Sequence, residues 1–401
     1  MIPYGKQSID KDDIQAVIDV LRSDWLTTGP KVEEFEKVFA ETVGAKYAVA
    51  VSSGTAALHA AMFALRIGPG DEVIVSPMTF AASANCIVYQ GGTPIFADVE
   101  PDTLLIDPIE VEKKITQRTK AIIAVDYAGQ PCDYDQLLSI SRSHNIPLIA
   151  DACHALGARY KGRPVGSLAD LNVFSFHPVK HITTGEGGMI TTDHEEFAQR
   201  MRIFRNHGIT TDHRQREQQG SWFYEMTELG YNYRITDFQC ALGISQLKKL
   251  PKWIARRQEI AAIYDEAFAA ISGIKPLGLR ADMIFAKEYA NLSLQNPMPL
   301  SPSLLPSIHA YHLYVVRLDE KLIGKTRQDI FTGLRNAGVG VNVHYIPVHL
   351  HPFYRNAFKY HRGLCPVAEA AYEKIISLPM FVGLSNDQQN YIIETLHNII
   401  P

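Results

Sequence analysis

Apolar and polar residues follow one another along this chain with periods that predict a regular succession of helices and strands. Residues 9–21 repeat apolar positions every three or four residues, which predicts an amphipathic helix. A second helix is expected over 31–43, after the break at WLTTGP. From 46 to 76 an apolar strand, a small-residue turn, an alanine-rich helix and a second strand indicate a βαβ unit.

The same alternation continues through the next hundred residues. Further strands are expected at PIFADV, AIIAVDYAG, PLIADA and LNVFSF, with an amphipathic helix at CDYDQLLSISRSHN and, after GGMITTD, a helix at EEFAQRMRIFRNHG. Alternating elements of this length predict an α/β fold with a mostly parallel sheet that is covered on both faces. Ligands then bind at the carboxyl ends of the strands.

The pattern changes in the second half of the chain. Residues 209–219 are polar without apolar periodicity, which predicts an exposed loop, and an aromatic-rich segment follows that favours a core or a subunit interface. A long charged helix begins near Pro251, where we expect the domain boundary. Residues 1–250 would form a large domain and 251–401 a small α+β domain, with strands at YHLYVVRL and VGVNVHYI and helices at TRQDIFTGLRNAG and 386–399.

Composition restricts the function more than it identifies it. The 401 residues are 46% hydrophobic, as in a globular protein, and the net charge of −4 supplies no basic stripe for nucleic acid or a membrane surface. The sequence shows no signal-peptide pattern and no apolar run of about 18 residues, so we expect a cytoplasmic protein. Five widely spaced cysteines favour buried reduced thiols, and no metal site is expected.

A lysine that follows the apolar run LNVFSF is the first candidate for chemistry. Lys180 stands among Ser175, His177, Thr183 and Thr184. A lysine that is partly removed from water there loses its preference for the ammonium form, and its amine becomes a nucleophile toward carbonyl carbons. For this lysine alone, a solubilising surface charge is the alternative.

An aspartate that ends the apolar run PLIAD is the second candidate. Asp151 would suit the protonated ring nitrogen of pyridoxal phosphate (PLP), a cofactor that binds covalently to a lysine such as Lys180. A helix-capping aspartate is the alternative for this residue alone.

Two further features also fall at strand ends. Gly54 and Thr55 belong to an SSGT turn between a strand and a helix, where free N–H groups and the helix dipole stabilise a phosphate; ordinary N-capping is the alternative. Phe80 follows the next strand and would either enter the core or stack on a flat cofactor ring. One crevice could hold all of these groups.

The chain as a whole resembles the DegT/DnrJ/EryC1/StrS family of sugar aminotransferases, which are PLP-dependent transferases of fold type I. The resemblance rests on seven motifs in the family's order and spacing: WLTTGP, SSGTAALH, PMTFAASAN, IADACHALG, SFHPVKHITTGEGGM, GYNYRITDFQCALG and VHYIPVHLHPFY. The form SFHPVK with ITTGEGG is most similar to enzymes of the pseudaminic acid route. These aminate C4 of a UDP-4-keto-6-deoxy-N-acetylhexosamine, UDP-2-acetamido-2,6-dideoxy-β-L-arabino-hex-4-ulose.

The resemblance implies a role for each motif residue. Lys180 would bind PLP covalently and Asp151 would pair with its ring nitrogen. The remaining cofactor contacts would be Gly54, Thr55 and Ser175 at the phosphate, Phe80 on the ring and His154 near the ring hydroxyl. Asn232 would reach the cofactor phosphate of the neighbouring subunit, which implies a homodimer with shared active sites.

Substrate contacts are less sharply indicated. Arg234 would help to receive an acidic donor or the sugar nucleotide. The other candidates are Thr28, which could also be part of a plain turn, and His177, Thr184, His312, His344 and His349. A lone histidine is more often a structural residue with satisfied hydrogen bonds.

The expected reaction is the transfer of an amino group from L-glutamate to the UDP-linked ketosugar, with pyridoxamine phosphate as the intermediate form of the cofactor. Family members that act on bacillosamine-type sugars, on lipid A pentoses or on dTDP-3- and 4-ketosugars share the same cofactor residues, so these substrates are alternatives. A PLP sugar dehydratase, in which histidine replaces the lysine, and a scaffold protein without chemistry are further alternatives. Lys180 argues against both.

Overall fold

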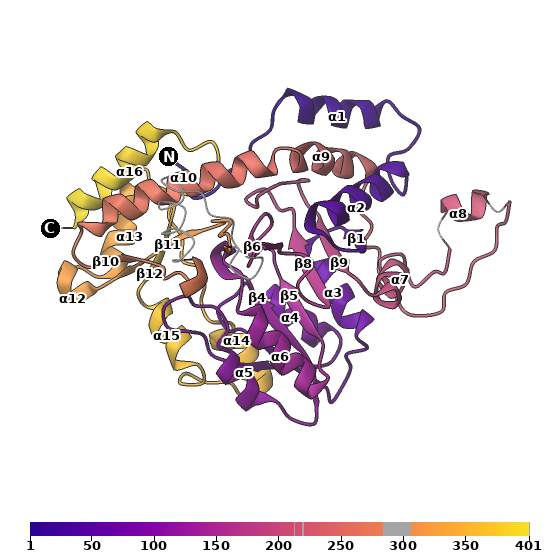
Figure 1. The fold of residues 1–401 in the computed structure, drawn as a ribbon, viewed down its shortest axis with the longest axis horizontal. Coiled ribbons are helices and arrows are strands. Elements are labelled where there is room, and N and C mark those ends of the chain that lie inside the picture. Colours follow the sequence, from indigo (N-terminus) through magenta and orange to yellow (C-terminus); the bar gives the residue numbers. More distant parts are fainter. Residues whose placement is uncertain (212, 219, 284–305, 401) are drawn as a thin grey trace, which may run out of the picture.

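The chain is organised around two sheets (Figure 1), and apolar side chains collect in one core around each of them. The larger core surrounds a seven-stranded sheet and the smaller one a three-stranded sheet. The computed structural model describes residues 1–211, 213–218, 220–283 and 306–400.

The large sheet is parallel except for one strand. Its strands are β1 (Tyr47–Val51), β2 (Glu72–Val75), β3 (Thr93–Phe96), β4 (Thr119–Val125), β5 (Leu148–Asp151), β8 (Leu171–Ser175) and β9 (Gly188–Thr192). They lie in the order β1-β9-β8-β5-β4-β2-β3, and only β9 runs antiparallel to its neighbours. Helices cover both faces, which buries nearly every strand residue and explains the continuous apolar runs in the sequence. The predicted mostly parallel sheet is confirmed.

The helices up to residue 247 begin and end near their sequence signals. They are α1 (Lys11–Leu21), α2 (Pro30–Val43), α3 (Gly54–Ala64), α4 (Ala82–Tyr89), α5 (Pro108–Lys114), α6 (Tyr134–His144), α7 (Glu195–Phe204) and α9 (Asp237–Leu247). Asp10 caps α1 through a reciprocal capping box with Asp13, and Ser53 caps α3. Asn145 ends α6 in the left-handed conformation that asparagine tolerates.

The smaller core is built on an antiparallel sheet. Its strands β10 (Ile274–Pro276), β11 (Tyr314–Leu318) and β12 (Ile375–Leu378) pack with the long helix α10 (Leu250–Ala269), with α12 (Glu320–Ile323), α13 (Arg327–Asn336) and α16 (Asn386–Ile399). The helices α14 (Pro352–Phe358) and α15 (Pro366–Tyr372) instead add side chains to the larger core. The chain after 251 therefore contributes to both cores, and the domain boundary stays a prediction.

Two local predictions were wrong. Residues 339–346 form no strand, although they alternate like one; their backbone makes isolated bridges to Ile2 and Ser377 before the chain turns toward the large sheet. Within the predicted loop 209–219, residues 213–218 form the short helix α8 (His213–Gln218). This helix stands away from the body of the molecule (Figure 1), so no buried face produces an apolar period.

Candidate active site

Lys180 lies in the bend that follows β8, at the carboxyl edge of the large sheet. Its side chain is half-buried, and its Nζ is 3.5 Å from Nε2 of His312. Burial lowers the pKa of Lys180, and the nearby Cys153 and Asp151 partly oppose this by raising it. The amine form is therefore more accessible than in a lysine in water.

Asp151 ends the adjacent strand β5 and is 5% exposed. Its Oδ2 accepts a hydrogen bond of 2.6 Å from Ser83 Oγ, and its Oδ1 accepts one of 3.2 Å from the N–H of Cys153. The Ser83 hydroxyl is itself 2.7 Å from Thr79 Oγ1, so α4 and the segment before it fix the carboxylate. The sequence reasoning missed Ser83, although it stands in the motif PMTFAASAN that carries Phe80.

The SSGT turn and the end of β8 touch each other. A Cβ on Gly54 would lie 2.8 Å from Cβ of Ser175, and a Cβ on Gly188 would lie 2.4 Å from the carbonyl oxygen of Ser53, so both glycines are required by close packing. No described residue accepts a hydrogen bond from the N–H groups of Gly54 and Thr55, which point from the first turn of α3. Free N–H groups at the positive end of an 11-residue helix fit a phosphate.

Four buried histidines surround the lysine. The ring of His154 lies 4.3 Å from that of His312, and its Nε2 forms a hydrogen bond of 3.1 Å with the Tyr345 hydroxyl. The Nε2 of His181 donates a hydrogen bond to the carbonyl of Ala310. Burial lowers the pKa of each of these rings, as it does for His344, whose pKa falls to about 4. The rings are therefore neutral at neutral pH. The sequence reasoning missed His181 and Tyr345 because their partners lie far away in the chain.

Phe80 is 62% exposed, which is unusual for a phenylalanine, and its ring lies 6.3 Å from that of Tyr345. A free aromatic face at a strand end fits a flat cofactor ring.

The side chains of three predicted substrate residues have other partners or face solvent. His349 is fully buried and its Nε2 is 2.9 Å from Oε1 of Glu369, so its ring serves a structural hydrogen bond. His177 is exposed, and the hydroxyl of Thr184 donates to the carbonyl of Glu186 within its own turn. The structure thus does not bring these side chains to Lys180 through any contact among the described residues.

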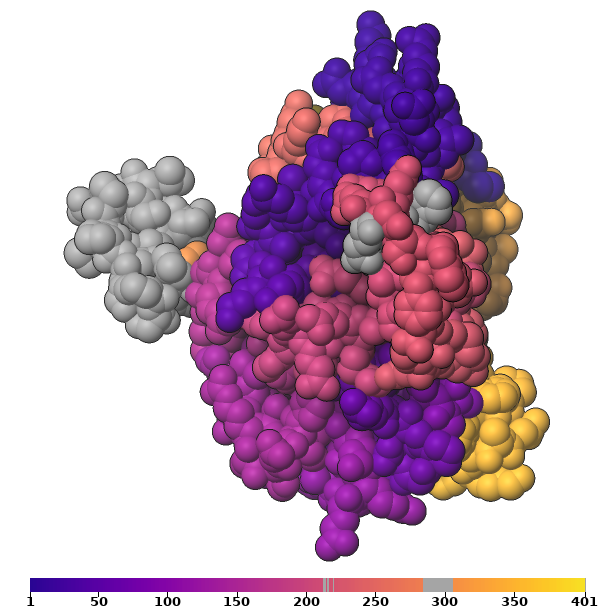
Figure 2. All heavy atoms as spheres, turned by 90° about the vertical axis from the view of Figure 1, so that its right-hand side faces the viewer, coloured from indigo at the N-terminus to yellow at the C-terminus, as the bar shows by residue number. Residues whose placement is uncertain are grey.

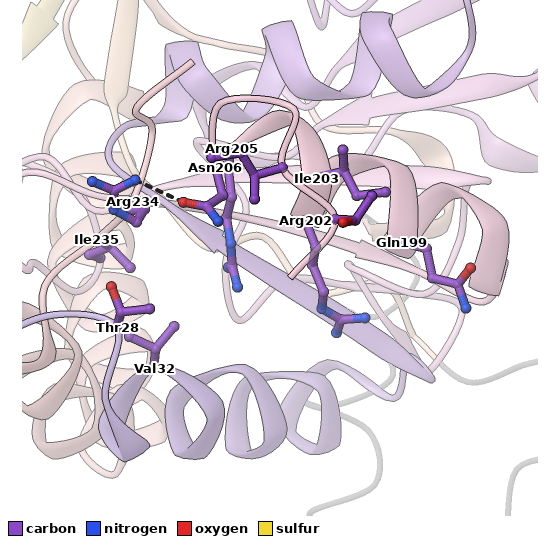
Figure 3. Close-up of a pocket in the computed structure, with 11 residues that line it drawn as sticks. Thr28, Val32, Gln199, Arg202, Ile203, Arg205, Asn206, Arg234 and Ile235 are labelled. Atoms are coloured by element: carbon purple, nitrogen blue, oxygen red, sulfur yellow. Dashed lines mark hydrogen bonds between the residues drawn. The ribbon is translucent and has the colours of Figure 1, made fainter. Parts of the chain in front are cut away.

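A cavity of about 300 Å³ opens between α2, α7 and the chain before α9 (Figure 3). Thr28 and Val32 lie on one side of it, and Asn206 accepts a hydrogen bond of 2.8 Å from Arg234 on the other. Arg234 forms no ion pair with any residue that the structure describes. The predicted substrate residues Thr28 and Arg234 therefore share one cavity.

The same cavity is strongly basic. Arg202 and Arg205 also line it, and both pair with the single carboxylate of Glu36. Three guanidinium groups against one carboxylate favour an anionic ligand. The sequence reasoning did not single out Arg202 or Arg205, because helix periodicity alone makes them look like solvent-exposed charges.

Asn232 is exposed, at the end of the aromatic segment (residues 220–232). Figure 2 shows this segment, in rose, on the face that also carries N-terminal residues in indigo. Large apolar side chains in it are open to solvent: Trp222 85%, Phe223 55%, Tyr224 52%, Met226 63%, Leu229 72% and Tyr231 40%. Several large apolar side chains exposed within one segment are typical of a protein interface.

The described part of the chain contains neither a membrane-spanning helix nor a metal-binding cluster. None of the helices there is long and apolar enough to cross a membrane. Within the same residues, no group of three or more His, Cys, Asp or Glu side chains has an arrangement that could hold a metal ion.

The chain matches known proteins over its full length. The model of the DegT/DnrJ/EryC1/StrS aminotransferase family matches residues 7–397. The spore coat polysaccharide biosynthesis protein SpsC of Bacillus subtilis (strain 168) is 42% identical over 401 residues, which cover 100% of this chain and 97% of that protein.

Solved aminotransferase structures are also similar to this chain. Spr1654 from Streptococcus pneumoniae, in its PMP form, superimposes with a TM-score of 0.87 at 35% identity and covers 100% of this chain and 99% of that one. Helicobacter pylori PseC, an aminotransferase involved in the biosynthesis of pseudoaminic acid, superimposes with a TM-score of 0.86 at 31% identity, with the same coverage.

The arrangement around Lys180 fits pyridoxal phosphate, because it offers an amine, a buried acid on the next strand and a phosphate cradle that a single Cβ on Gly54 would fill. Together with the match over residues 7–397, this shows that the chain belongs to the DegT/DnrJ/EryC1/StrS aminotransferase family and is a PLP-dependent sugar aminotransferase of fold type I.

Proposed function

We propose that this enzyme transfers the amino group of L-glutamate to C4 of UDP-2-acetamido-2,6-dideoxy-β-L-arabino-hex-4-ulose, a cytoplasmic step of pseudaminic acid biosynthesis. The observation that carries the amino-transfer chemistry is the half-buried amine of Lys180, with its lowered pKa, beside Asp151. The full-length likeness to PseC and the form of the SFHPVKHITTGEGG motif support the choice of sugar.

The residues at the strand ends would hold the cofactor. Gly54 and Thr55 would donate backbone N–H groups to the phosphate and Ser175 its hydroxyl. Phe80 would lie against one face of the ring, and His154 would contact its hydroxyl side. Each assignment follows the family motif, and the packing of Gly54 on Ser175 supports the phosphate contacts.

The chemistry follows from the two ionisable groups. When bound, PLP carries the amino group between the substrates and takes up the electrons released when a Cα–H bond breaks. Asp151 would hold the proton on the ring nitrogen. Lys180 would take the proton from Cα as a base and return it to C4′ of the cofactor as an acid. The kinetics would be ping-pong.

The neighbouring subunit would complete the site. In the proposed homodimer, the aromatic segment packs against the second copy and Asn232 reaches the partner's cofactor phosphate. The basic cavity with Arg234 and Thr28 would receive an anionic group, either a carboxylate of glutamate or the diphosphate of the sugar nucleotide.

Incubation of PLP-loaded enzyme with glutamate and two UDP-N-acetyl-4-keto-6-deoxyhexoses, the β-L-arabino and α-D-xylo isomers, tests the proposal. Mass spectrometry and NMR of the product should show amination of the L-arabino sugar alone. Lys180→Ala should abolish turnover, and borohydride should then no longer fix the cofactor to position 180. Amination of neither sugar, with glutamate still converting the cofactor, would move the acceptor to another nucleotide ketosugar.

A second candidate is amination of a different nucleotide ketosugar. The 42% identity with SpsC, a spore coat polysaccharide biosynthesis protein, favours it. Preference for the D-xylo isomer would support a bacillosamine-type sugar instead, with the roles of Lys180 and Asp151 unchanged.

A further inference from the structure

The backbone of residues 310–313, which carries His312, is held by the short 3-10 turn η1 (Tyr127–Gly129). The carbonyls of Ala128 and Gly129 accept hydrogen bonds of 3.2 and 2.9 Å from two N–H groups of this segment. A Cβ on Gly129 would lie 2.9 Å from the backbone nitrogen of His312, closer than Cβ atoms approach other atoms. Glycine is therefore required where the two segments touch.

A buried arginine holds the same segment from the other side. Arg257, on α10, is 2% exposed, and its Nη1 donates to the carbonyls of Tyr311 at 2.9 Å, His312 at 3.4 Å and Met380 at 3.2 Å. No carboxylate that the structure describes pairs with it. Burying an unpaired guanidinium is costly, so its three carbonyl contacts point to a requirement for a fixed segment here.

The imidazole of His312 has one polar partner among the described residues. Its Nε2 faces Nζ of Lys180 at 3.5 Å, and its Nδ1 is buried without a hydrogen bond in either tautomer. Burial, the charge of Lys180 and the neighbouring rings lower its pKa well below the usual histidine value. The ring is therefore neutral, and it can accept from an ammonium or donate to an amine.

We infer that His312 is a positioning residue for Lys180: its neutral imidazole holds the lysine amine in place whenever that amine is not bonded to the cofactor. This rests on the proposed function. The contacts of its backbone with η1 and Arg257 fix the position of the His312 ring. The ring then offers a hydrogen-bond partner to Nζ of Lys180 while that nitrogen is not bonded to the cofactor. The assignment replaces the expectation that His312 contacts the sugar.

Other groups also set the charge of the amine. Asp151 and Cys153, at the end of β5, favour the ammonium form. His154, His181 and His344 face the site as neutral rings, and the fixed positive charge of Arg257 lies behind His312 and His181. Replacing His312 leaves all of these groups in place, so a change in the pKa of Lys180 can be attributed to the loss of the imidazole.

The test measures Lys180 itself. Full-length cofactor-free protein is reductively methylated over a range of pH, and methylation at Lys180 is followed by peptide mass spectrometry. His312→Phe, which keeps a ring of similar volume but no acceptor, should lower the midpoint by about one pH unit, a tenfold change in the amine-to-ammonium ratio. In His312→Gln the amide oxygen can accept a hydrogen bond from the ammonium, so the midpoint should return most of the way to the wild-type value. His349→Gln is the matched control, because His349 is equally buried and bonded to Glu369.

An unchanged midpoint in His312→Phe would overturn the inference. If that variant does not fold, NMR of ¹⁵N-labelled histidine rings decides: the His312 signals should shift in Lys180→Ala, and unshifted signals would contradict the contact. Borohydride reduction of PLP-loaded wild-type protein distinguishes a failure of this inference from a failure of the proposed function. Cofactor fixed at Lys180 with unchanged methylation means that only the role of His312 is wrong, whereas no fixation there refutes the proposed function as well.

Discussion

At the scale of single residues, the site depends on positions where only glycine fits. Gly54 and Gly188 lie where β1 and β8 end and β9 begins, and an added Cβ on either would overlap the opposite segment. The N–H groups of Gly54 and Thr55 stay open to a phosphate because of this close approach. The same contact brings Ser175 to the turn without any charged residue.

Gly54→Ala should weaken cofactor binding by at least about tenfold while the protein still folds, because the new methyl group would be 2.8 Å from Cβ of Ser175 and would displace the turn. Titration of cofactor-free protein with PLP, followed by absorbance, measures this. Gly68→Ala is the control, since a Cβ there meets nothing within 4 Å. Equal PLP affinities in the two variants would refute the cradle.

Asp151→Asn should retain bound PLP but slow the half-reaction with glutamate by about 10² or more, because an amide cannot hold the ring-nitrogen proton. The substituted side chain has nearly the same shape and would still fit between Ser83 and the Cys153 N–H, so the fold should be preserved. Stopped-flow absorbance of the cofactor during glutamate addition measures the rate. A half-reaction as fast as that of the wild type would exclude the proposed role of Asp151.

At the scale of elements, the aromatic segment is apolar in composition but exposed to solvent. It carries six large apolar side chains that are 40% to 85% exposed, whereas α3 and the strands of the sheet bury theirs. Short bridges from Asn206 to Asn232 and from Ile209 to Met226 hold it as a paired extension. An extension that is ordered but apolar is explained if a second copy covers it.

Mixing Lys180→Ala and Asn232→Ala subunits should restore up to about a quarter of wild-type activity, since half of the dimers are mixed and each has one intact site. The measurement is turnover after subunit exchange, with heterodimers verified by mass. Lys180→Ala mixed with Asp151→Asn provides the control. Both changes lie in the same subunit's half of a site, so no intact site should form. Recovery in both mixtures, or in neither, would contradict a site completed by the partner's Asn232.

At the scale of the whole molecule, the buried histidines couple stability to pH. Burial lowers the pKa of several of them: His59 and His344 to about 4, His309 to about 3, and His154, His181 and His312 well below the ordinary value. In the unfolded chain each would bind a proton near pH 6.5. Between that pH and the folded-state values the unfolded chain binds more protons, so acidification favours unfolding.

The free energy of unfolding should therefore fall from pH 7.5 to 5.5, by up to about 1.4 kcal/mol per pH unit for each coupled histidine below pH 6.5. Urea denaturation at several pH values measures it. Asp126 acts in the opposite direction, because burial raises its pKa from 3.8 to about 7 and the folded state then holds the extra proton. In Asp126→Asn, the free energy of unfolding should therefore fall more steeply as the pH is lowered. Stability that is constant or greater at pH 5.5 would show that the histidines are not buried in this way.

Much of the fold could be predicted from local pattern. The strands of the parallel sheet are buried on both faces, so they are read from unbroken apolar runs, and α1, α6 and α16 carry cap residues at their ends. Asp151 and Lys180 could be identified because Asp151 ends such a run, Lys180 follows another within a few residues, and parallel strands end at the same edge. These features depend on neighbours within a few residues.

Only the tertiary structure decided what surrounds those two residues. His312 reaches Lys180 from 132 positions away, Arg234 joins Thr28 in one cavity, and His349 turns to Glu369 instead of the site. Periodicity cannot distinguish these outcomes, because a histidine or arginine has the same local pattern whether its partner is a substrate, a lysine or a carboxylate. The sequence by itself determined which atoms can react. Long-range packing determined which groups set their protonation and position.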